Sequence, residues 1–231
     1  MSTASLGREY FEDVYAREAD PWRFATSDYE REKYNATLAA LPRARYACGL
    51  EIGCSIGVLT RRLAARCDRL LATDIAEEPL REARRRSTDA PWVEFARSAA
   101  PREWPEGTFD LILLSEVVYY LSRADVDLLA ERVVGSLATR GDLVLVHWTG
   151  ETDYPLSGDE ATERLLERPI RLFGRRLKSV SSAFALTWRV VVELQGTRGT
   201  EAREAEFQEH HGKDAPPKCT LILRGSPGPP Q

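Results

Sequence analysis

Short apolar runs alternate with amphipathic segments over residues 47–148 of this chain. The runs that have the length and composition of buried strands are 47–53, 69–75, 92–98, 109–117 and 141–148. Apolar positions at helical spacing predict helices over 57–67, 78–87 and 123–139, the last of them closed by Gly141. Alternation of this kind predicts a parallel sheet that is covered by helices on both faces.

The flanking segments extend this pattern. Before the first strand we expect two amphipathic helices, over 5–17 and 28–41, with a break at Asp20-Pro21. After residue 150 we expect a helix over 158–167, a polar connection over 196–217, and strands over 187–196 and 219–225. The sequence therefore predicts one α/β domain over residues 1–224, with a doubly wound, mostly parallel, seven-stranded sheet, and a disordered tail over 225–231.

Net charge and the spacing of the cysteines limit which partners and which cellular compartment we expect. The 231 residues carry a net charge of −4, so no overall positive field attracts nucleic acid or a membrane surface. No apolar run approaches the length of a membrane-spanning helix, and the first residues lack the pattern of a secretory signal. The cysteines form no Cys-x-x-Cys pair, which indicates free thiols in a reducing compartment. We expect a cytoplasmic protein without a metal site.

The turn after the first expected strand reads LEIGCSIG and carries Gly53 and Gly57. Glycines let the backbone pass close to a ligand, and the start of the following helix offers free N–H groups at the positive end of its dipole. A nicotinamide or flavin fingerprint would need glycine where Ser55 and Val58 stand, and the sequence has no Gly-x-x-x-x-Gly-Lys phosphate loop. An ordinary strand-to-helix turn explains the two glycines equally well.

The second expected strand ends in ATDI, which places Asp74 at the carboxyl end of that strand. Open parallel sheets bind ligands at this edge, where an acidic side chain accepts hydrogen bonds from ribose hydroxyls. The alternative is a helix cap, because aspartate often precedes a helix. Together, the glycine turn, Asp74 and the alternating pattern favour a nucleoside ligand.

Three motifs in order, LEIGCSIG, ATDI and FDLILLSEVVYYL, resemble those of class I S-adenosyl-L-methionine-dependent methyltransferases. The stretches DPW, YEREKY and SEVVYYL resemble the nodulation-protein-S (NodS-like) group, whose members N-methylate the free amine of a partly deacetylated chitin oligosaccharide. The resemblance covers roughly residues 10–150. It implies a Rossmann-like domain with an N-terminal helical lid over 1–42, a cofactor-binding core over 47–148, and substrate-side elements and last strands over 149–224.

The resemblance also implies where S-adenosyl-L-methionine binds. Its methionine part would lie along the turn that contains Glu51, Gly53, Cys54 and Gly57, and Asp74 would bind the ribose.

The adenine would pack on Ile75, and Ser115 would face the methyl-donating side. Ala99 stands where the family often has an aspartate near the adenine amine, which leaves that contact to backbone groups or to Ser98.

The segment before the first strand carries Trp22, Tyr29, Arg31 and Tyr34. On the resemblance it folds over the cofactor, with Arg31 available to the methionine carboxylate and aromatic rings around the sulfonium. The alternative is a pair of helices that pack on the edge of the sheet.

Methyl transfer from a sulfonium is an in-line displacement in which positioning and the exclusion of water supply most of the rate. An amine acceptor that enters protonated must lose a proton, so a nearby base helps. The candidates for contact with the acceptor are Glu116, Tyr119 and His147. A satisfied polar residue at a strand end is the alternative for His147, and core packing is the alternative for Tyr119.

The expected function is N-methylation of a free amine on an amino sugar or oligosaccharide-like acceptor. A second hypothesis keeps the cofactor but moves the methyl group to a hydroxyl or carboxylate of a small metabolite. A third hypothesis, a cofactor-binding subunit without turnover, is compatible with Ala99 but not favoured by the intact glycine turn. The sequence leaves the oligomeric state open.

Overall fold

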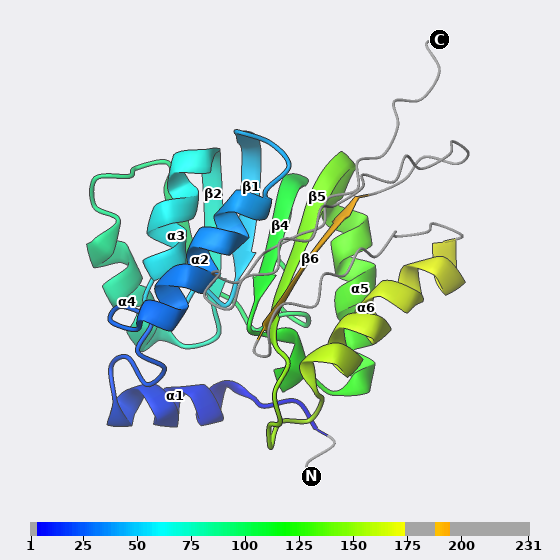
Figure 1. The fold of residues 1–231 in the computed structure, drawn as a ribbon, viewed down its shortest axis with the longest axis horizontal. Helices are drawn as coiled ribbons and strands as arrows, with labels where there is room; N and C mark the ends of the chain where they lie inside the picture. The colour runs from blue at the N-terminus through cyan, green and yellow to red at the C-terminus, as the bar shows by residue number, and fades with distance from the viewer. Residues whose placement is uncertain (1–3, 174–187, 195–231) are drawn as a thin grey trace, which may run out of the picture.

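The computed structural model describes residues 4–173 and 188–194, in which helices flank one sheet (Figure 1). The helices are α1 (Arg8–Arg17), α2 (Asp28–Ala40), α3 (Val58–Leu63), α4 (Glu77–Arg86), α5 (Arg123–Ser136) and α6 (Gly158–Phe173), with single 3-10 turns η1 (Ala64–Arg66) and η2 (Val118–Tyr120). The strands are β1 (Tyr46–Ile52), β2 (Cys67–Asp74), β3 (Val93–Arg97), β4 (Phe109–Ser115), β5 (Leu137–Trp148) and β6 (Trp188–Leu194). Within the described ranges, no helix is both long enough and apolar enough to cross a membrane.

The described strands form one sheet in the order β3-β2-β1-β4-β5-β6. β1 to β5 pair in parallel, and β6 pairs antiparallel with β5. The strand order reverses between β1 and β4, because β2 and β3 lie on one side of β1 and β4 and β5 on the other. The expected doubly wound, mostly parallel sheet is therefore confirmed. The seventh strand, expected over 219–225, lies outside the described residues, as do the connection over 196–217 and the tail over 225–231.

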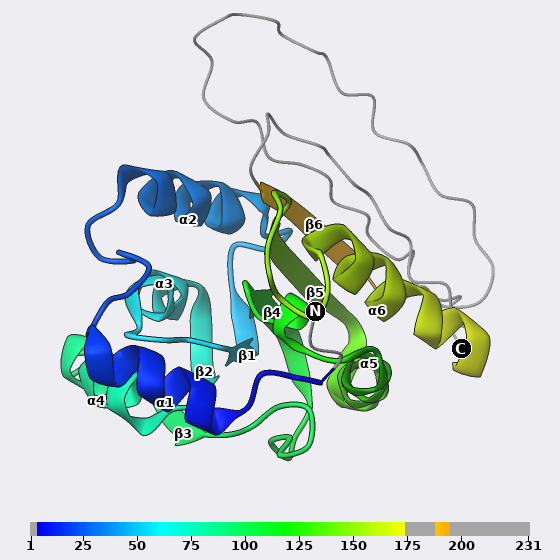
Figure 2. The same cartoon turned by 90° about the horizontal axis from the view of Figure 1, so that it is seen from below.

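Alternating side chains of β4 build a core on each face of the sheet. Ile112 and Leu114 belong to a cluster that includes Leu129 of α5 and residues of α6. Leu111 and Leu113 belong to a second cluster with residues of α2 and α3. Figure 2 shows the same division, with α5 and α6 on one side of the sheet and α2 and α3 on the other. The apolar run of β4 is therefore that of a central strand buried on both faces.

The boundary between α5 and β5 differs from the expectation. α5 ends at Ser136, and β5 begins at Leu137, so Gly141 lies inside the strand and not at a helix end. The register with β4 shifts at the start of β5. A Cβ on Gly141 would lie 2.8 Å from Leu137 Cδ1 and 3.0 Å from the carbonyl oxygen of Ala138. The prediction was wrong because glycine is needed here for a local irregularity of the strand, which helical spacing does not reveal.

α1 runs across the edge of the sheet at which the parallel strands end (Figure 1). The segment before it is held by a hydrogen bond from the N–H of Leu6 to the carbonyl oxygen of Tyr120, at 2.9 Å. Within α1, the hydroxyl of Tyr15 lies 2.6 Å from that of Ser55. The N-terminal segment thus contacts both the turn after β1 and the 3-10 turn after β4.

Candidate functional site

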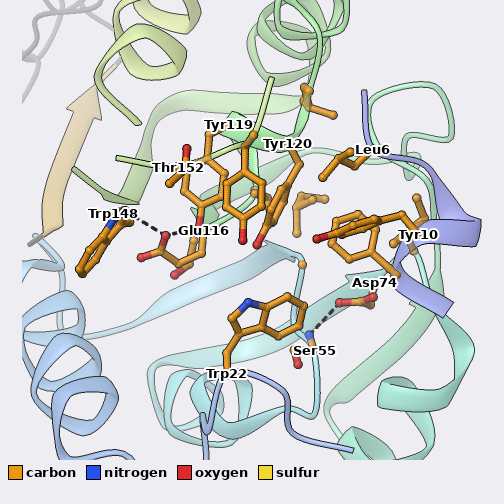
Figure 3. Close-up of a pocket in the computed structure, with 18 of the residues that line it drawn as sticks. Leu6, Tyr10, Trp22, Ser55, Asp74, Glu116, Tyr119, Tyr120, Trp148 and Thr152 are labelled. Atoms are coloured by element: carbon orange, nitrogen blue, oxygen red, sulfur yellow. Dashed lines mark hydrogen bonds between the residues drawn. The ribbon is translucent and has the colours of Figure 1, made fainter. Parts of the chain in front are cut away.

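A cavity of about 670 Å³ is lined by the N-terminal segment and by residues at the carboxyl ends of β1, β2 and β4 (Figure 3). Open parallel sheets bind ligands at this edge, where the strand order reverses. In Figure 3, Trp22, Ser55 and Asp74 lie on one side, the Asp74 side, and Glu116, Tyr119 and Trp148 lie on the other, the Glu116 side. The sequence-predicted site residues that line the cavity are Trp22, Gly53, Asp74, Ile75, Ser98, Ser115, Glu116 and Tyr119.

The turn after β1 requires glycine at two positions. Gly53 has a φ of +79°, and a Cβ there would lie 2.1 Å from Val117 Cγ1. Gly57 has a φ of +77°, and a Cβ there would lie 2.8 Å from Cα of Ala83 in α4. Both backbone conformations are left-handed, and side chains other than that of glycine disfavour them. Gly53 therefore brings bare backbone to the cavity, whereas Gly57 allows α3 and α4 to pack closely.

Asp74 ends β2 and holds this turn in place. Its Oδ2 accepts a hydrogen bond from the N–H of Ser55 at 2.8 Å, and its Oδ1 accepts one from the N–H of Ala76 at 3.0 Å. Burial raises the pKa of Asp74 to about 6, although backbone N–H groups oppose this shift. Asp74 does not cap α4, the alternative considered above, because the N-cap of that helix is Ala76 and no side chain caps it. The lone pairs that remain on the carboxylate suit hydroxyl donors from a ligand.

The wall beside Asp74 is apolar and aromatic. Ile75 and Trp22 both line the cavity, and Trp22 stacks on Phe24 with ring centroids 5.5 Å apart. Tyr15 meets Trp22 edge-on at 5.6 Å. Such a surface suits a flat ring system.

Ser98 and Ala99, after β3, both contact Glu103. The hydroxyl of Ser98 donates to the carbonyl oxygen of Glu103, and the N–H of Ala99 donates to Glu103 Oε2 at 2.8 Å. Ser98 lines the cavity, whereas Ala99 does not. Glu103 thus occupies the polar groups that follow β3.

Glu116 follows β4 with a φ of +58°, a conformation that residues other than glycine rarely adopt. Its Oε2 accepts hydrogen bonds from the hydroxyl of Tyr119 at 2.5 Å and from the N–H of Trp148 at 3.0 Å (Figure 3). Its own N–H donates to the carbonyl oxygen of Val146 at 2.8 Å. Burial raises the pKa of Tyr119 far above its ordinary value, so this hydroxyl stays a donor. These bonds over-determine the strained residue, a pattern typical of functional sites.

Lys33 of α2 completes the Glu116 side, and the sequence analysis did not identify it. Its Nζ lies 3.1 Å from Glu116 Oε1 and 2.9 Å from Glu30 Oε1, and its side chain is only 3% exposed. Burial raises the pKa of Glu30. The i,i+3 spacing of Glu30 and Lys33 was visible in the motif YEREKY. Their meeting with Glu116, however, depends on the fold.

Six predicted site residues do not line the cavity: Arg31, Glu51, Cys54, Gly57, Ala99 and His147. The side chain of Arg31 is 62% exposed and pairs with Asp28, because the turn of α2 that directs Lys33 inward directs Arg31 outward. His147 is buried, since alternation along β5 sends it to the face opposite Trp148. Glu51 and Cys54 are buried as well, and burial raises the pKa of Glu51 to about 7. The structure therefore does not bring Arg31 or His147 to the cavity.

Aromatic rings form the rest of the Glu116 side. Tyr119 and Tyr154 stack with ring centroids 5.2 Å apart and an interplanar angle of 10°. Tyr120 meets Tyr154 edge-on at 4.6 Å, and Trp148 meets Tyr29 of α2 at 6.1 Å. Stacked rings beside carboxylates are typical of sites that bind polar ligands with apolar faces.

The model of the family described as Nodulation protein S (NodS) matches residues 10–149 of this chain. Nodulation protein S of Rhizobium tropici is 33% identical over 127 residues, which are 54% of this chain and 53% of that protein. The chain spans about half the length of the curated nodulation proteins that it matches.

Solved structures agree with this match. A putative methyltransferase from Pseudomonas syringae is 34% identical with a TM-score of 0.61, covering 72% of this chain and 99% of that one. The N-methyltransferase NodS from Bradyrhizobium japonicum WM9, in complex with S-adenosyl-L-homocysteine, is 24% identical with a TM-score of 0.70, covering 80% of this chain and 97% of that one. The expected class I methyltransferase fold is confirmed.

Proposed function

This chain belongs to the Nodulation protein S (NodS) family, and from that premise we propose that it transfers a methyl group from S-adenosyl-L-methionine to a free amine of an amino sugar or oligosaccharide-like acceptor. The proposal has two parts, the cofactor and the acceptor, and each is supported by a different side of one cavity.

The Asp74 side fits the cofactor. Asp74 would hold the ribose hydroxyls, Ile75 and Trp22 would pack on the adenine, and the backbone at Gly53 would border the methionine part. When bound, the cofactor supplies a methyl group that is already activated on a sulfonium. The bond between Tyr15 and Ser55 holds α1 at this side and helps to exclude water.

The acidic lining of the Glu116 side is the observation that carries the acceptor class. Glu30, Glu116, Glu151 and Asp153 line the cavity, and Lys33 is the one basic residue among the described residues that do so. Such a lining favours an acceptor that donates N–H groups and disfavours an anionic one, such as a phosphate ester or a carboxylate.

Glu116 is the residue that we assign to orienting the amine. Tyr119 and the backbone of Trp148 fix its Oε2, which leaves Oε1 facing Lys33 and able to accept a further N–H. The stacked rings of Tyr119 and Tyr154 offer an apolar surface for the face of a sugar.

Calorimetry with S-adenosyl-L-homocysteine tests the cofactor part. We expect the wild-type protein to bind it and Asp74→Ala to bind it at least about tenfold more weakly, because hydrogen bonds to a charged acceptor are lost. Asp89→Ala is the matched control, since Asp89 is exposed and pairs with Arg61 at the surface. Failure of the wild-type protein to bind, or equal binding by Asp74→Ala, would count against the proposal.

Methylation assays test the acceptor part. Oligomers of D-glucosamine with free amines are expected to accept the methyl group, and their fully N-acetylated forms are not. Methylation of the N-acetylated forms or of simple alcohols would favour the hydroxyl hypothesis. Cofactor binding without turnover on any acceptor would favour the hypothesis of a binding subunit.

A further inference from the structure

An amine reaches the Glu116 side from water mostly as an ammonium ion, which has no lone pair for attack. A buried carboxylate stabilises a cation within about 4–6 Å, and so favours this unreactive form. Glu116 without a counter-ion would therefore hold the acceptor in the wrong protonation state.

Lys33 shifts the balance between ammonium ion and neutral amine, because it already forms an ion pair with Glu116. Oε2 of Glu116 accepts two hydrogen bonds, and Oε1 lies 3.1 Å from Lys33 Nζ. The remaining acceptor capacity is therefore a lone pair on Oε1. An acceptor N–H that bonds there shares Oε1 with Lys33, which places the two nitrogens roughly 4–5 Å apart.

We propose that Lys33 is a positioning residue which, through its ion pair with Glu116, makes the site bind the acceptor amine in its unprotonated form; the inference rests on the proposed function. The ammonium ion releases one proton to solvent as it binds, and the neutral amine donates one N–H to Glu116 Oε1. Its lone pair then remains available for the methyl carbon. Compared with the same site without Lys33, a like charge at this distance lowers the pKa of the bound amine by about one unit or more.

Lys33 contacts a second carboxylate besides Glu116. Glu30 Oε1 lies 2.9 Å from its Nζ, and burial raises the pKa of Glu30, although the charge of Lys33 opposes this shift. Tyr29 and Tyr34 lie 5.6 Å and 5.9 Å from Nζ, measured to their ring centroids. Burial raises the pKa of Tyr34 and that of Tyr119, so the hydroxyls of Tyr34 and Tyr119 stay neutral.

Titratable groups from β1, β5 and η2 lie around Lys33, Glu30 and Glu116. Glu51 of β1 acts on Tyr34 by its charge, and burial raises the pKa of Glu51 to about 7. His147 of β5 faces the ring of Tyr119, at 6.0 Å between centroids. Tyr120, whose pKa burial also raises, contacts Tyr119 edge-on. Glu151 and Asp153, which follow β5, also line the cavity, but among the described residues the ion pair of Glu116 is with Lys33.

Calorimetry that counts protons tests this inference without turnover. The disaccharide of D-glucosamine is titrated into protein saturated with S-adenosyl-L-homocysteine at about pH 6.5, in two buffers that differ in ionisation enthalpy. We expect the wild-type protein to release at least about a third of a proton for each acceptor bound, because a fall of about one unit from an ordinary amine pKa leaves the bound amine partly protonated at this pH. Lys33→Met is expected to release several-fold fewer, because Glu116 then holds the ammonium ion. Lys33→Arg keeps the charge and is expected to restore the release.

The controls separate this role from a structural one. A merely structural Lys33 would weaken binding in Lys33→Met without changing the proton count, which would overturn the inference. Binding of S-adenosyl-L-homocysteine reports whether each variant is folded. If Lys33→Met does not fold, the number of protons that the wild-type protein releases still tests the inference. Acceptor binding without proton release by the wild-type protein overturns the inference and leaves the proposed function standing. Absence of any binding overturns the amine acceptor and, with it, this inference.

Discussion

Asp74 and Glu51 lie on neighbouring strands, and burial raises the pKa of their carboxyl groups to about 6 and about 7. A carboxylate in this state is held at some cost in the free protein, because few donors replace the water that it has lost. A ligand that brings hydroxyl donors to Asp74 removes part of that cost. Each residue therefore leads to a distinct pH dependence.

Binding of S-adenosyl-L-homocysteine is expected to weaken as the pH falls through about 6, the pKa of Asp74. Ribose hydroxyls donate to the ionised carboxylate, so binding selects the deprotonated form and lowers its pKa in the complex. The affinity is therefore full above this pH and falls by up to about tenfold for each pH unit below it. Calorimetry across this range measures the effect, and Asp74→Asn should bind weakly with no such dependence. A flat wild-type profile would contradict the assignment of Asp74.

Glu51→Gln is expected to stabilise the free protein at alkaline pH. The pKa of Glu51 rises from 4.5 to about 7 on folding, so its contribution to stability is full below the unfolded value and is lost as the pH rises through the folded value. Glutamine stays neutral, and at about pH 8 the free energy of unfolding should increase by about 1–3 kcal/mol. Urea denaturation at acidic and alkaline pH measures this gain, which should vanish at the acidic end. Glu12→Gln, at an exposed position of α1, serves as the control.

Single residues also mark how far the sequence could lead. Asp74 was predictable, because an acidic residue at a strand end acts through its position in the motif. Lys33 was missed because α2 and Glu116 lie far apart in the sequence, and their ion pair exists only in the folded chain. Arg31 was predicted and Lys33 was not considered, since nothing in the motif showed which side of α2 faces the cavity. A helical wheel anchored on buried Tyr34 and Thr37 would have favoured Lys33.

At the scale of elements, the turn between β1 and α3 decides whether the Asp74 side exists. Gly53 and Gly57 hold left-handed conformations, and Ser55 between them does so as well, with a φ of +49°. The N–H of Ser55 bonds to Asp74. The turn therefore holds the end of β2, and a change in its backbone would shift the carboxylate of Asp74.

Gly53→Ala is expected to lower the free energy of unfolding by about 2–4 kcal/mol, because overpacking adds to backbone strain. The added Cβ would lie 2.1 Å from Val117 Cγ1, at a φ of +79°. Chemical denaturation measures this loss of stability. Adding Val117→Ala to Gly53→Ala should recover the part of the loss that comes from overpacking, but not the part that comes from backbone strain.

Gly135→Ala is the matched control. Gly135 lies in α5, where an added Cβ would meet no atom within 4 Å apart from its chain neighbours and the backbone of its own helix, so alanine should stabilise the helix by about 0.5–1 kcal/mol. If both alanine variants had the same stability, the close approach at Gly53 would not be a constraint on the fold.

Elements were predicted unevenly. The apolar runs of β1, β2 and β4 were clear because central parallel strands are buried on both faces. The start of β5 was not, since residues 137–140 continue the apolar spacing of α5, and among them only Leu137 pairs with β4, opposite Phe109. Tertiary contact overrode local periodicity there.

At the scale of the whole molecule, one cavity joins segments from α1 to the loop after β5, so a bound cofactor should stabilise the domain as a unit. A ligand at about 100 times its dissociation constant stabilises the folded state by about 2.7 kcal/mol. For a domain of this size, that corresponds to a rise in Tm of about 5–11 °C. Thermal denaturation with S-adenosyl-L-homocysteine measures the shift, and Asp74→Ala should lose most of it. No shift in the wild-type protein at saturating ligand would contradict cofactor binding.

The anchoring of α1 bears on how the chain matures during synthesis. Leu6 bonds to Tyr120, and Ser5 bonds to Asp125, across about half of the sequence. The ribosome releases α1 long before it makes β4 and α5, so the helix that is translated early finds its partners late. A nascent chain that has completed β1 and β2 therefore has the carboxylate of Asp74, but it still lacks the residues after β4 and β5 that complete the cavity.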